Sequence, residues 1–219
     1  SDGNAVAYGG VLTGGGWAST GTYSKENGYT SGRNNSGPYI DAVDKFNYAT
    51  EGNATDVGNL TVGRSYGASQ SSATYGYLSG GSSAGRHDVI DRWAFASDGD
   101  AADVGNLLAA TNSIGNGQQS ETYGYISGGQ DTPGQYLNVI QKFPFANATT
   151  NSTDIADLVY GNLDGSGSSS TTHGYRAGGP AGGYTGSDWI QKFSTSSDAN
   201  ATDIGNLTEN ILYTAGCQY

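Results

Sequence analysis

A short glycine-rich stretch recurs four times along this 219-residue chain, and its spacing constrains the fold more than any other feature. The four copies read GYTSGR, GYLSGG, GYISGG and GYRAGG, and they begin at Gly28, Gly76, Gly124 and Gly174. Their first glycines are therefore 48, 48 and 50 residues apart. A fixed period of this length is typical of supersecondary units that pack against one another.

Two further motifs accompany the glycine-rich stretch in constant order. The first reads VDKFNYA, IDRWAFA, IQKFPFA and IQKFSTS, at residues 43–49, 90–96, 140–146 and 190–196. The second reads ATDVGNL, AADVGNL, STDIADL and ATDIGNL, at residues 54–60, 101–107, 152–158 and 201–207. The three motifs define one domain over residues 1–219, with repeats at about 13–60, 61–107, 108–158 and 159–207.

Each repeat has the pattern of four short β-strands. In the second repeat the expected strands cover residues 64–70, 74–79, 88–96 and 102–107, with turn-forming residues between them. Glycine recurs every few residues and no long segment carries an apolar stripe at helical spacing, so helices are not expected. The sequence therefore predicts an all-β array.

A four-stranded unit of this size cannot bury both faces of its sheet alone. Repeated around an axis, such sheets pack on their neighbours as the blades of a β-propeller. The first strand of each blade would lie nearest the axis, where crowding favours small residues. Aromatic pairs on the third strand are expected to fill the space between blades. They are Phe46/Tyr48, Trp93/Phe95 and Phe143/Phe145, with Phe193/Thr195 in the last repeat.

The two ends of the chain fall outside the four repeats, at residues 1–12 and 208–219. Leu12 stands 48 residues before Leu60, as the end of a final strand would, and residues 211–216 resemble the glycine-rich motif. Because open sheet edges are avoided in proteins, we expect these segments to be closing strands of a partial fifth blade. A ring of four blades, or ends that pair with another chain in a homo-oligomer, are the alternatives.

Charge and hydropathy exclude two classes of partner. The net charge is −11, and the sequence has no basic stripe that would displace counterions from a nucleic acid. It also has no run of about 18 apolar residues, so no membrane insertion is expected.

The motifs resemble the kelch repeat, in which a strand ending in Gly-Gly is followed by an aromatic strand and a closing strand. The closing motif DVGNL departs from that repeat by lacking its tryptophan, and only Arg64 stands at the arginine position. The fuller pattern of GYxSGG, VIxKFxFA and NATDVGNLT is similar to kelch-like repeats in virion proteins of marine bacteriophages, especially cyanophages. The resemblance covers about residues 16–207.

This resemblance implies a non-enzymatic structural protein on the virion surface, outside the cell. It would serve as a capsid decoration, a tail fibre or another appendage. Its partners would be other virion proteins, or a glycan or receptor on the host surface. Because a fold does not determine a function, a secreted lectin-like propeller that binds carbohydrate is the alternative.

An enzyme of the galactose-oxidase type is a third possibility, since that enzyme is also a kelch-like propeller. Copper requires several imidazole or phenolate ligands at one place. The two histidines, His87 and His173, lie in different repeats, and Cys217 is the only thiol. We therefore expect no catalytic residue and no resident cofactor.

Acidic turns recur between the last two strands of the repeats. In the second repeat, Asp98, Asp100 and Asp103 offer oxygen atoms at the close spacing that calcium requires. Asp and Asn are also ordinary turn formers, because their side chains bond to nearby backbone amides. We favour the turn over the calcium site.

A cation and an aspartate recur at fixed positions in every repeat. We expect them to form a structural ion pair across strands or between blades. The predicted pairs are Lys45 with Asp56, Arg92 with Asp103, Lys142 with Asp154, and Lys192 with Asp203.

The loops between the second and third strands differ while their frames repeat. Loops on a rigid scaffold commonly carry binding residues, and aromatic and polar side chains suit contact with a glycan or a protein. The alternative is that these loops merely tolerate variation. The candidate contact residues are Tyr39, Arg86, His87, Tyr136 and Tyr184.

Overall fold

The computed structural model describes residues 12–112, 115, 117–146, 149, 151–181 and 185–216. Its strands form four antiparallel sheets, each of four strands in sequence order, which we call blades 1 to 4. Blades 1 and 2 contain β1 (Thr20–Tyr23), β2 (Asn27–Asn34), β3 (Tyr39–Asn47), β4 (Thr55–Asn59), β5 (Ala68–Ser71), β6 (Tyr75–Ser79), β7 (Val89–Ala94) and β8 (Ala102–Asn106). Blades 3 and 4 contain β9 (Gln118–Gln119), β10 (Tyr123–Ser127), β11 (Val139–Pro144), β12 (Thr153–Asp157), β13 (Ser166–Ser169), β14 (His173–Ala177), β15 (Ser187–Ser194) and β16 (Thr202–Ile211).

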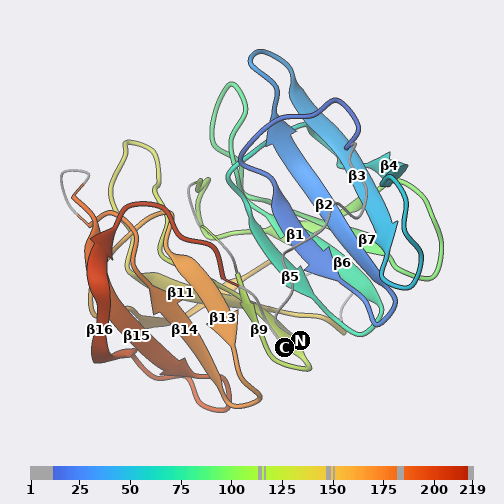
Figure 1. Ribbon diagram of the computed structural model, residues 1–219. Coiled ribbons are helices and arrows are strands. Elements are labelled where there is room, and N and C mark those ends of the chain that lie inside the picture. The colour runs from blue at the N-terminus through green and yellow to red at the C-terminus, as the bar shows by residue number, and fades with distance from the viewer. Residues whose placement is uncertain are drawn as a thin grey trace, which may run out of the picture.

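The blades are arranged around a common axis (Figure 1). Their first strands lie side by side, β1 against β5, β5 against β9, and β9 against β13. The sheet of blade 1 and the sheet of blade 4 stand on opposite sides in Figure 1, in blue and in orange to red. The predicted all-β propeller of four-stranded blades, with the first strands innermost, is confirmed.

The strand bounds agree with the sequence prediction except at two places. The inner strand of blade 2 begins at Ala68 rather than residue 64, because Arg64 turns into the interior before the strand starts. At the C-terminus, residues 208–211 continue β16, and Ile211 pairs with Ser187 of the same blade. The predicted closing strand at residues 1–12 lies, except for Leu12, outside the described residues. The described residues do not show a fifth blade.

The Gly-Tyr pair of the repeat places an aromatic ring over a glycine. Gly76 lies directly opposite Trp93 on the neighbouring strand, and Gly124 lies opposite Phe143. A Cβ atom at Gly76 would stand 2.6 Å from the Trp93 ring, and one at Gly124 would stand 2.5 Å from the Phe143 ring. The third-strand ring therefore occupies the space that a side chain would need, which explains why the motif begins with glycine.

The Gly-Gly pair that ends the second strand combines a left-handed turn with a close backbone approach. Gly80 and Gly81 have φ of 64° and 103°, values that favour glycine. A Cβ atom at Gly81 would stand 2.7 Å from the carbonyl oxygen of Ser65, at the entry to the same blade. The pair thus lets the chain leave β6 while the inner connection passes against it.

Aromatic rings join consecutive blades, as predicted, except that Tyr48 of the first predicted pair is exposed. Tyr29 of blade 1 stacks on Phe95 of blade 2 with ring centroids 4.9 Å apart, and Tyr77 of blade 2 stacks on Phe145 of blade 3 at the same distance. Between blades 3 and 4, where threonine replaces the second aromatic residue, the Tyr125 hydroxyl donates a hydrogen bond to the Thr195 carbonyl oxygen. We call each of these contact zones a seam.

The backbone reinforces every one of these three seams. At the first seam, Gly99 and Ala101 of blade 2 donate amide hydrogen bonds to the carbonyl oxygens of Val57 and Asn59 in blade 1. Asp100 accepts two further bonds from Asn59, from the amide and from the side chain. The acidic turn therefore bonds to the neighbouring blade.

The predicted ion pairs between repeated cations and aspartates are wrong for the two lysines whose partners the structure shows. Lys45 pairs with Asp98 of the next blade at 2.5 Å, and Lys142 pairs with Asp198 in the same way at 2.6 Å. The reason is the strand register. Lys45 lies opposite Thr55, whereas Asp56 lies opposite Asp44 and so projects from the other face of the sheet.

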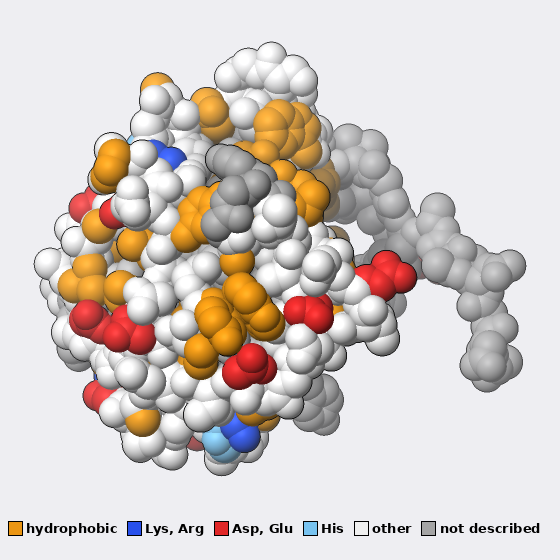
Figure 2. Space-filling model, turned by 90° about the vertical axis from the view of Figure 1, so that its left-hand side faces the viewer, with side chains coloured by type: hydrophobic (Ala, Val, Ile, Leu, Met, Phe, Trp, Pro, Cys, Tyr) orange, Lys and Arg blue, Asp and Glu red, His pale blue; other side chains and the backbone are white. Residues whose placement is uncertain are grey.

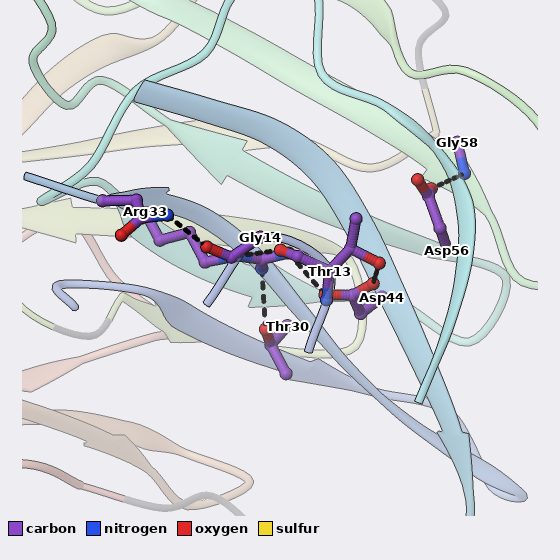
Figure 3. A network of polar contacts seen from close by, with 8 residues as sticks. Thr13, Gly14, Thr30, Arg33, Asp44, Asp56 and Gly58 are labelled. Atoms are coloured by element: carbon purple, nitrogen blue, oxygen red, sulfur yellow. Dashed lines mark hydrogen bonds and ion pairs between the residues drawn. The ribbon is translucent and has the colours of Figure 1, made fainter. Parts of the chain in front are cut away.

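The repeated aspartates have a different role. The Asp56 carboxylate accepts a hydrogen bond from the Gly58 amide at 3.2 Å (Figure 3), and Asp103 and Asp203 accept the same bond from Gly105 and Gly205. These bonds fold the fourth strand locally. Of the other two predicted cations, Arg92 lies over the ring of Tyr75, 4.4 Å from its centroid. No salt bridge joins Lys192 to Asp203, both of which the structure describes.

Two arginine–aspartate pairs lie fully buried in the first two blades. In blade 2, Arg64 contacts Asp91 at 2.8 Å and also donates to the carbonyl oxygens of Gly80 and Leu78. Thr61 completes the site, because its amide and hydroxyl both donate to the Asp91 carboxylate.

Blade 1 repeats this arrangement with different residues (Figure 3). Arg33 pairs with Asp44, and Thr13 donates its amide and hydroxyl to the same carboxylate. Because both charges are neutralised and hydrogen-bonded, each pair can remain buried while it fixes the start of a blade.

We expect the Gly124→Ala variant to be destabilised by about 1–3 kcal/mol, because the added methyl group would displace the Phe143 ring. Gly85→Ala is the matched control, since no heavy atom lies within 4 Å of its Cβ position. Its free energy of unfolding should change by no more than about 0.5 kcal/mol. Urea denaturation measures both values, and equal effects of the two variants would contradict the role given to the motif glycine.

We expect Asp91→Ala to lower the free energy of unfolding by about 3–5 kcal/mol, since it leaves the Arg64 charge buried without its partner. Asp98→Ala removes an exposed ion pair instead, and should cost less than about 1 kcal/mol. Denaturant titration of both variants tests the difference. A loss for Asp91→Ala no larger than that for Asp98→Ala would show that the buried pair does not hold the blade.

Candidate functional site

The loops between second and third strands lie at one end of the propeller, together with the connections between blades. We call this the loop end, and it comprises the described residues of 12–19, 35–38, 60–67, 80–88, 107–117, 128–138, 158–165 and 178–186. Backbone bridges tie the two sets together, Trp17 to Asn34 in blade 1 and Asn112 to Gln130 in blade 3. The loop end is therefore a hydrogen-bonded surface on the rigid blades.

The predicted contact residue Arg86 braces two neighbouring loops. Its Nε atom donates to the Asn112 side chain at 2.8 Å, and its Nη2 atom donates to the Gln130 side chain at 2.7 Å. Gln130 in turn bridges to the half-buried Tyr136 in its own loop. The structure thus brings Arg86 and Tyr136 together at Gln130, and the guanidinium group of Arg86 already holds the loops of blades 2 and 3.

The other predicted contact residues are spread over the loop end. His87 is half-buried, and its Nε2 atom lies 2.8 Å from the Ser83 hydroxyl. Burial, and next the Arg64 charge, lower the pKa of His87 below its usual value. Tyr39 is half-buried at the start of β3. Tyr184 lies outside the described residues.

A group of aromatic residues close to the axis was not predicted from the sequence. Trp17, Tyr66 and Tyr213 form this axial cluster. Trp17 is 50% exposed and Tyr213 is 69% exposed. The rings of Trp17 and Tyr66 meet edge to face with centroids 6.0 Å apart. Burial raises the pKa of Tyr66, and the neighbouring Asp164, Tyr213 and Tyr39 raise it further.

In blades 1, 2 and 4, the residue two positions before the inner strand has a left-handed backbone conformation. Ala18, Tyr66 and Asp164 occupy the same repeat position and have φ of 59°, 59° and 49°. Non-glycine residues rarely adopt this conformation, and such strain is concentrated at functional sites. The sequence pattern that could have indicated this site is the variation at one repeat position, which holds alanine in blade 1, tyrosine in blade 2 and aspartate in blade 4.

A carboxylate and a buried guanidinium group lie beside the axial cluster. Burial raises the pKa of Asp164, and the positive charge of Arg176 acts in the opposite direction. Arg176 is fully buried and donates from Nε to the Asn162 side chain at 3.0 Å. Its burial lowers its pKa to about 10, against the influence of Asp164. The axial end of blade 4 therefore carries a carboxylate and a buried guanidinium group.

The opposite end of the axis contains a cavity of about 850 Å³. It is lined by the four turns between first and second strands, at residues 23–25, 71–73, 119–122 and 169–171. Their serines accept hydrogen bonds from backbone amides within each turn, as Ser72 does from Tyr75 and Ser120 does from Tyr123. These hydroxyls stabilise the turns, so the loop end is the better candidate for ligand binding.

The described residues contain no group of three or more His, Cys, Asp or Glu side chains placed to hold a metal ion. In the acidic turn of blade 2, Asp98, Asp100 and Asp103 bind Lys45, Asn59 and the Gly105 amide, respectively. The described residues also contain no helix long and apolar enough to cross a membrane.

No protein-family model and no curated protein matches the sequence. Among solved structures, the chain is similar to one titled "Structure of YjhT", with a TM-score of 0.72 and 9% sequence identity. The similarity covers 88% of this chain and 66% of that chain, so this chain spans slightly less than two thirds of the other. At this identity the likeness shows the fold alone. The chain is a β-propeller of four four-stranded antiparallel blades.

Proposed function

We propose that this protein is a non-enzymatic binding propeller whose axial cluster contacts carbohydrate. The exposure of Trp17 and Tyr213 beside the axis is the observation that carries the proposal. Trp and Tyr provide large amphipathic contact surfaces with few rotatable bonds, so they lose little conformational entropy when they bind. Trp17 precedes the inner strand β1, and Tyr213 follows β16, so each is attached to a blade of the rigid scaffold.

The polar groups around the cluster suit a ligand rich in hydroxyl groups. Asp164 can accept hydrogen bonds from such a ligand, and it lies at the same end of the propeller as the loops that Arg86 holds together. The net charge of −11 disfavours anionic ligands, so we propose a neutral glycan. The buried charges of Arg64 and Asp91 are already neutralised by each other, which supports a structural role for them.

We further propose that the propeller is carried on the surface of a phage virion and contacts a host glycan there. The support is the resemblance of the repeats to kelch-like repeats of marine phage proteins. A secreted lectin-like propeller would use the same axial cluster, so the two possibilities differ in location rather than in binding chemistry.

Glycan-array binding by the purified chain tests the binding function. We expect signal on neutral glycans, and a loss of affinity of about fivefold or more for Trp17→Ala and for Tyr213→Ala, because each removes a central aromatic contact. Tyr48→Ala is the control, since Tyr48 is similarly exposed, at 49%, but lies beyond β3 at the other end of the blade. Absence of any glycan signal, or equal losses for all three variants, would exclude the axial cluster as a glycan site.

The location is tested with phage particles from the source of the sequence. Quantitative mass spectrometry of purified virions should find this chain in a fixed ratio to the major capsid protein. Its recovery only in the particle-free fraction would contradict the virion assignment and favour the secreted lectin.

A further inference from the structure

Blade 1 and blade 4 each have one exposed face, and the equivalent faces in the other blades are covered by a neighbouring blade. Ile204 on β16 is 48% exposed, whereas Val104 at the same repeat position in blade 2 is 6% exposed. Tyr48, which follows β3, is 49% exposed, whereas Phe145 at the same repeat position in blade 3 is 8% exposed. Figure 2 views the side that carries β16 and shows hydrophobic side chains gathered in the middle of it, between acidic ones.

The charges on these two faces are those that form ion pairs at the seams. Lys192 in blade 4 stands at the repeat position of Lys45, and Glu51 after β3 stands at the position of Asp98. Lys45 and Asp98 form the seam ion pair between blades 1 and 2. Neither Lys192 nor Glu51 takes part in a salt bridge within the described part of the chain. The open faces therefore carry opposite charges at matching heights.

The segments before blade 1 and after blade 4 make the same hydrogen bonds as the connections between consecutive blades. Thr13 bonds to Asp44 as Thr61, which arrives from blade 1, bonds to Asp91. At the other end, the Ile211 carbonyl oxygen accepts a hydrogen bond from the Gly179 amide. In blades 2 and 3, the equivalent amides of Gly81 and Gly129 donate to Thr111 and Asn162, which lie in the connections to the next blade.

Ala215 and Gly216, which follow Ile211, line a cavity of about 530 Å³ together with Tyr48 and residues of the inner strands β1, β5 and β9. Among the described residues, no second or third strand of a further blade lies between blade 4 and blade 1.

We propose that the space between blades 4 and 1 binds a β-hairpin from another chain that has the pattern of the second and third strands of the repeat. Facing blade 1, the hairpin would present a tyrosine toward Tyr48 and a cation toward Glu51. Facing blade 4, it would present an aromatic ring toward Tyr175 and a carboxylate toward Lys192. The three seams show each of these contacts between blades.

A hairpin fits this space better than a second copy of the whole chain does. Blades that pack with seam geometry share one axis. A second copy docked on blade 4 in that geometry would continue around the same axis, and its later blades would overlap blade 1. A single hairpin adds strands without such a continuation, by the strand-addition mode that other sheet proteins use for peptides.

The test uses the intact protein and a fluorescent synthetic peptide of residues 73–98. This peptide contains Tyr77, Arg92, Phe95 and Asp98, one group for each proposed contact. We expect saturable binding by fluorescence anisotropy, and a rise in the melting temperature of the protein when the peptide is in excess. A control peptide with Tyr77→Ser and Phe95→Ser should bind at least about tenfold more weakly.

A charge exchange distinguishes this site from nonspecific hydrophobic binding. Lys192→Glu in the protein should weaken binding of the peptide about two- to fivefold at low salt, and Asp98→Lys in the peptide should restore it. Trp17→Ala should leave peptide binding unchanged, which separates this site from the axial cluster. The proposal is wrong if no saturable binding occurs, if the charge exchange has no effect, or if sedimentation shows that Lys192→Glu dissociates an assembly of the protein with itself.

Discussion

The structure depends on one packing arrangement, in which an aromatic ring from the third strand of a blade lies over a glycine of the second. At Gly124 the Phe143 ring fills the space of the missing side chain. The tyrosine that follows this glycine points into the seam, where Tyr125 bonds to the next blade. The same two residues therefore hold the sheet together and join it to its neighbour, so four repeats with little hydrophobic content can form one propeller.

Polar interactions then position the blades around the axis. The buried pair of Arg64 and Asp91 receives Thr61 from the connection, which links the end of one blade to the start of the next. Bonds from Gly99 to Val57 fix the outer edge of the seam. Each seam uses an aromatic stack, an ion pair or backbone hydrogen bonds between equivalent repeat positions. The contacts that a partner would make with the exposed faces of blades 1 and 4 can therefore be deduced from the seams.

The two proposed binding surfaces follow from this repetition in opposite ways. The axial cluster arises where the repeats differ, since Trp17 and Tyr66 stand where their counterparts are smaller or polar. The space between blades 4 and 1 arises where the repeats agree, because Lys192 and Ile204 retain the residue types of a seam without the following blade. We therefore assign the glycan to the axial cluster, where the repeats differ in sequence, and the hairpin partner to the faces of blades 1 and 4, where the repeat residues are retained.

The sequence by itself determined the repeat, the strand order and the seam aromatics, because periodic glycines and rings report local geometry directly. It did not determine which charges meet. Lys45 pairs with Asp98 rather than Asp56 because adjacent residues project from opposite faces of a strand and the next blade lies on one of them. Only the tertiary structure placed the ring of Trp17 against that of Tyr66 and brought Tyr213 within electrostatic reach of Tyr66, since the three residues are far apart in the chain.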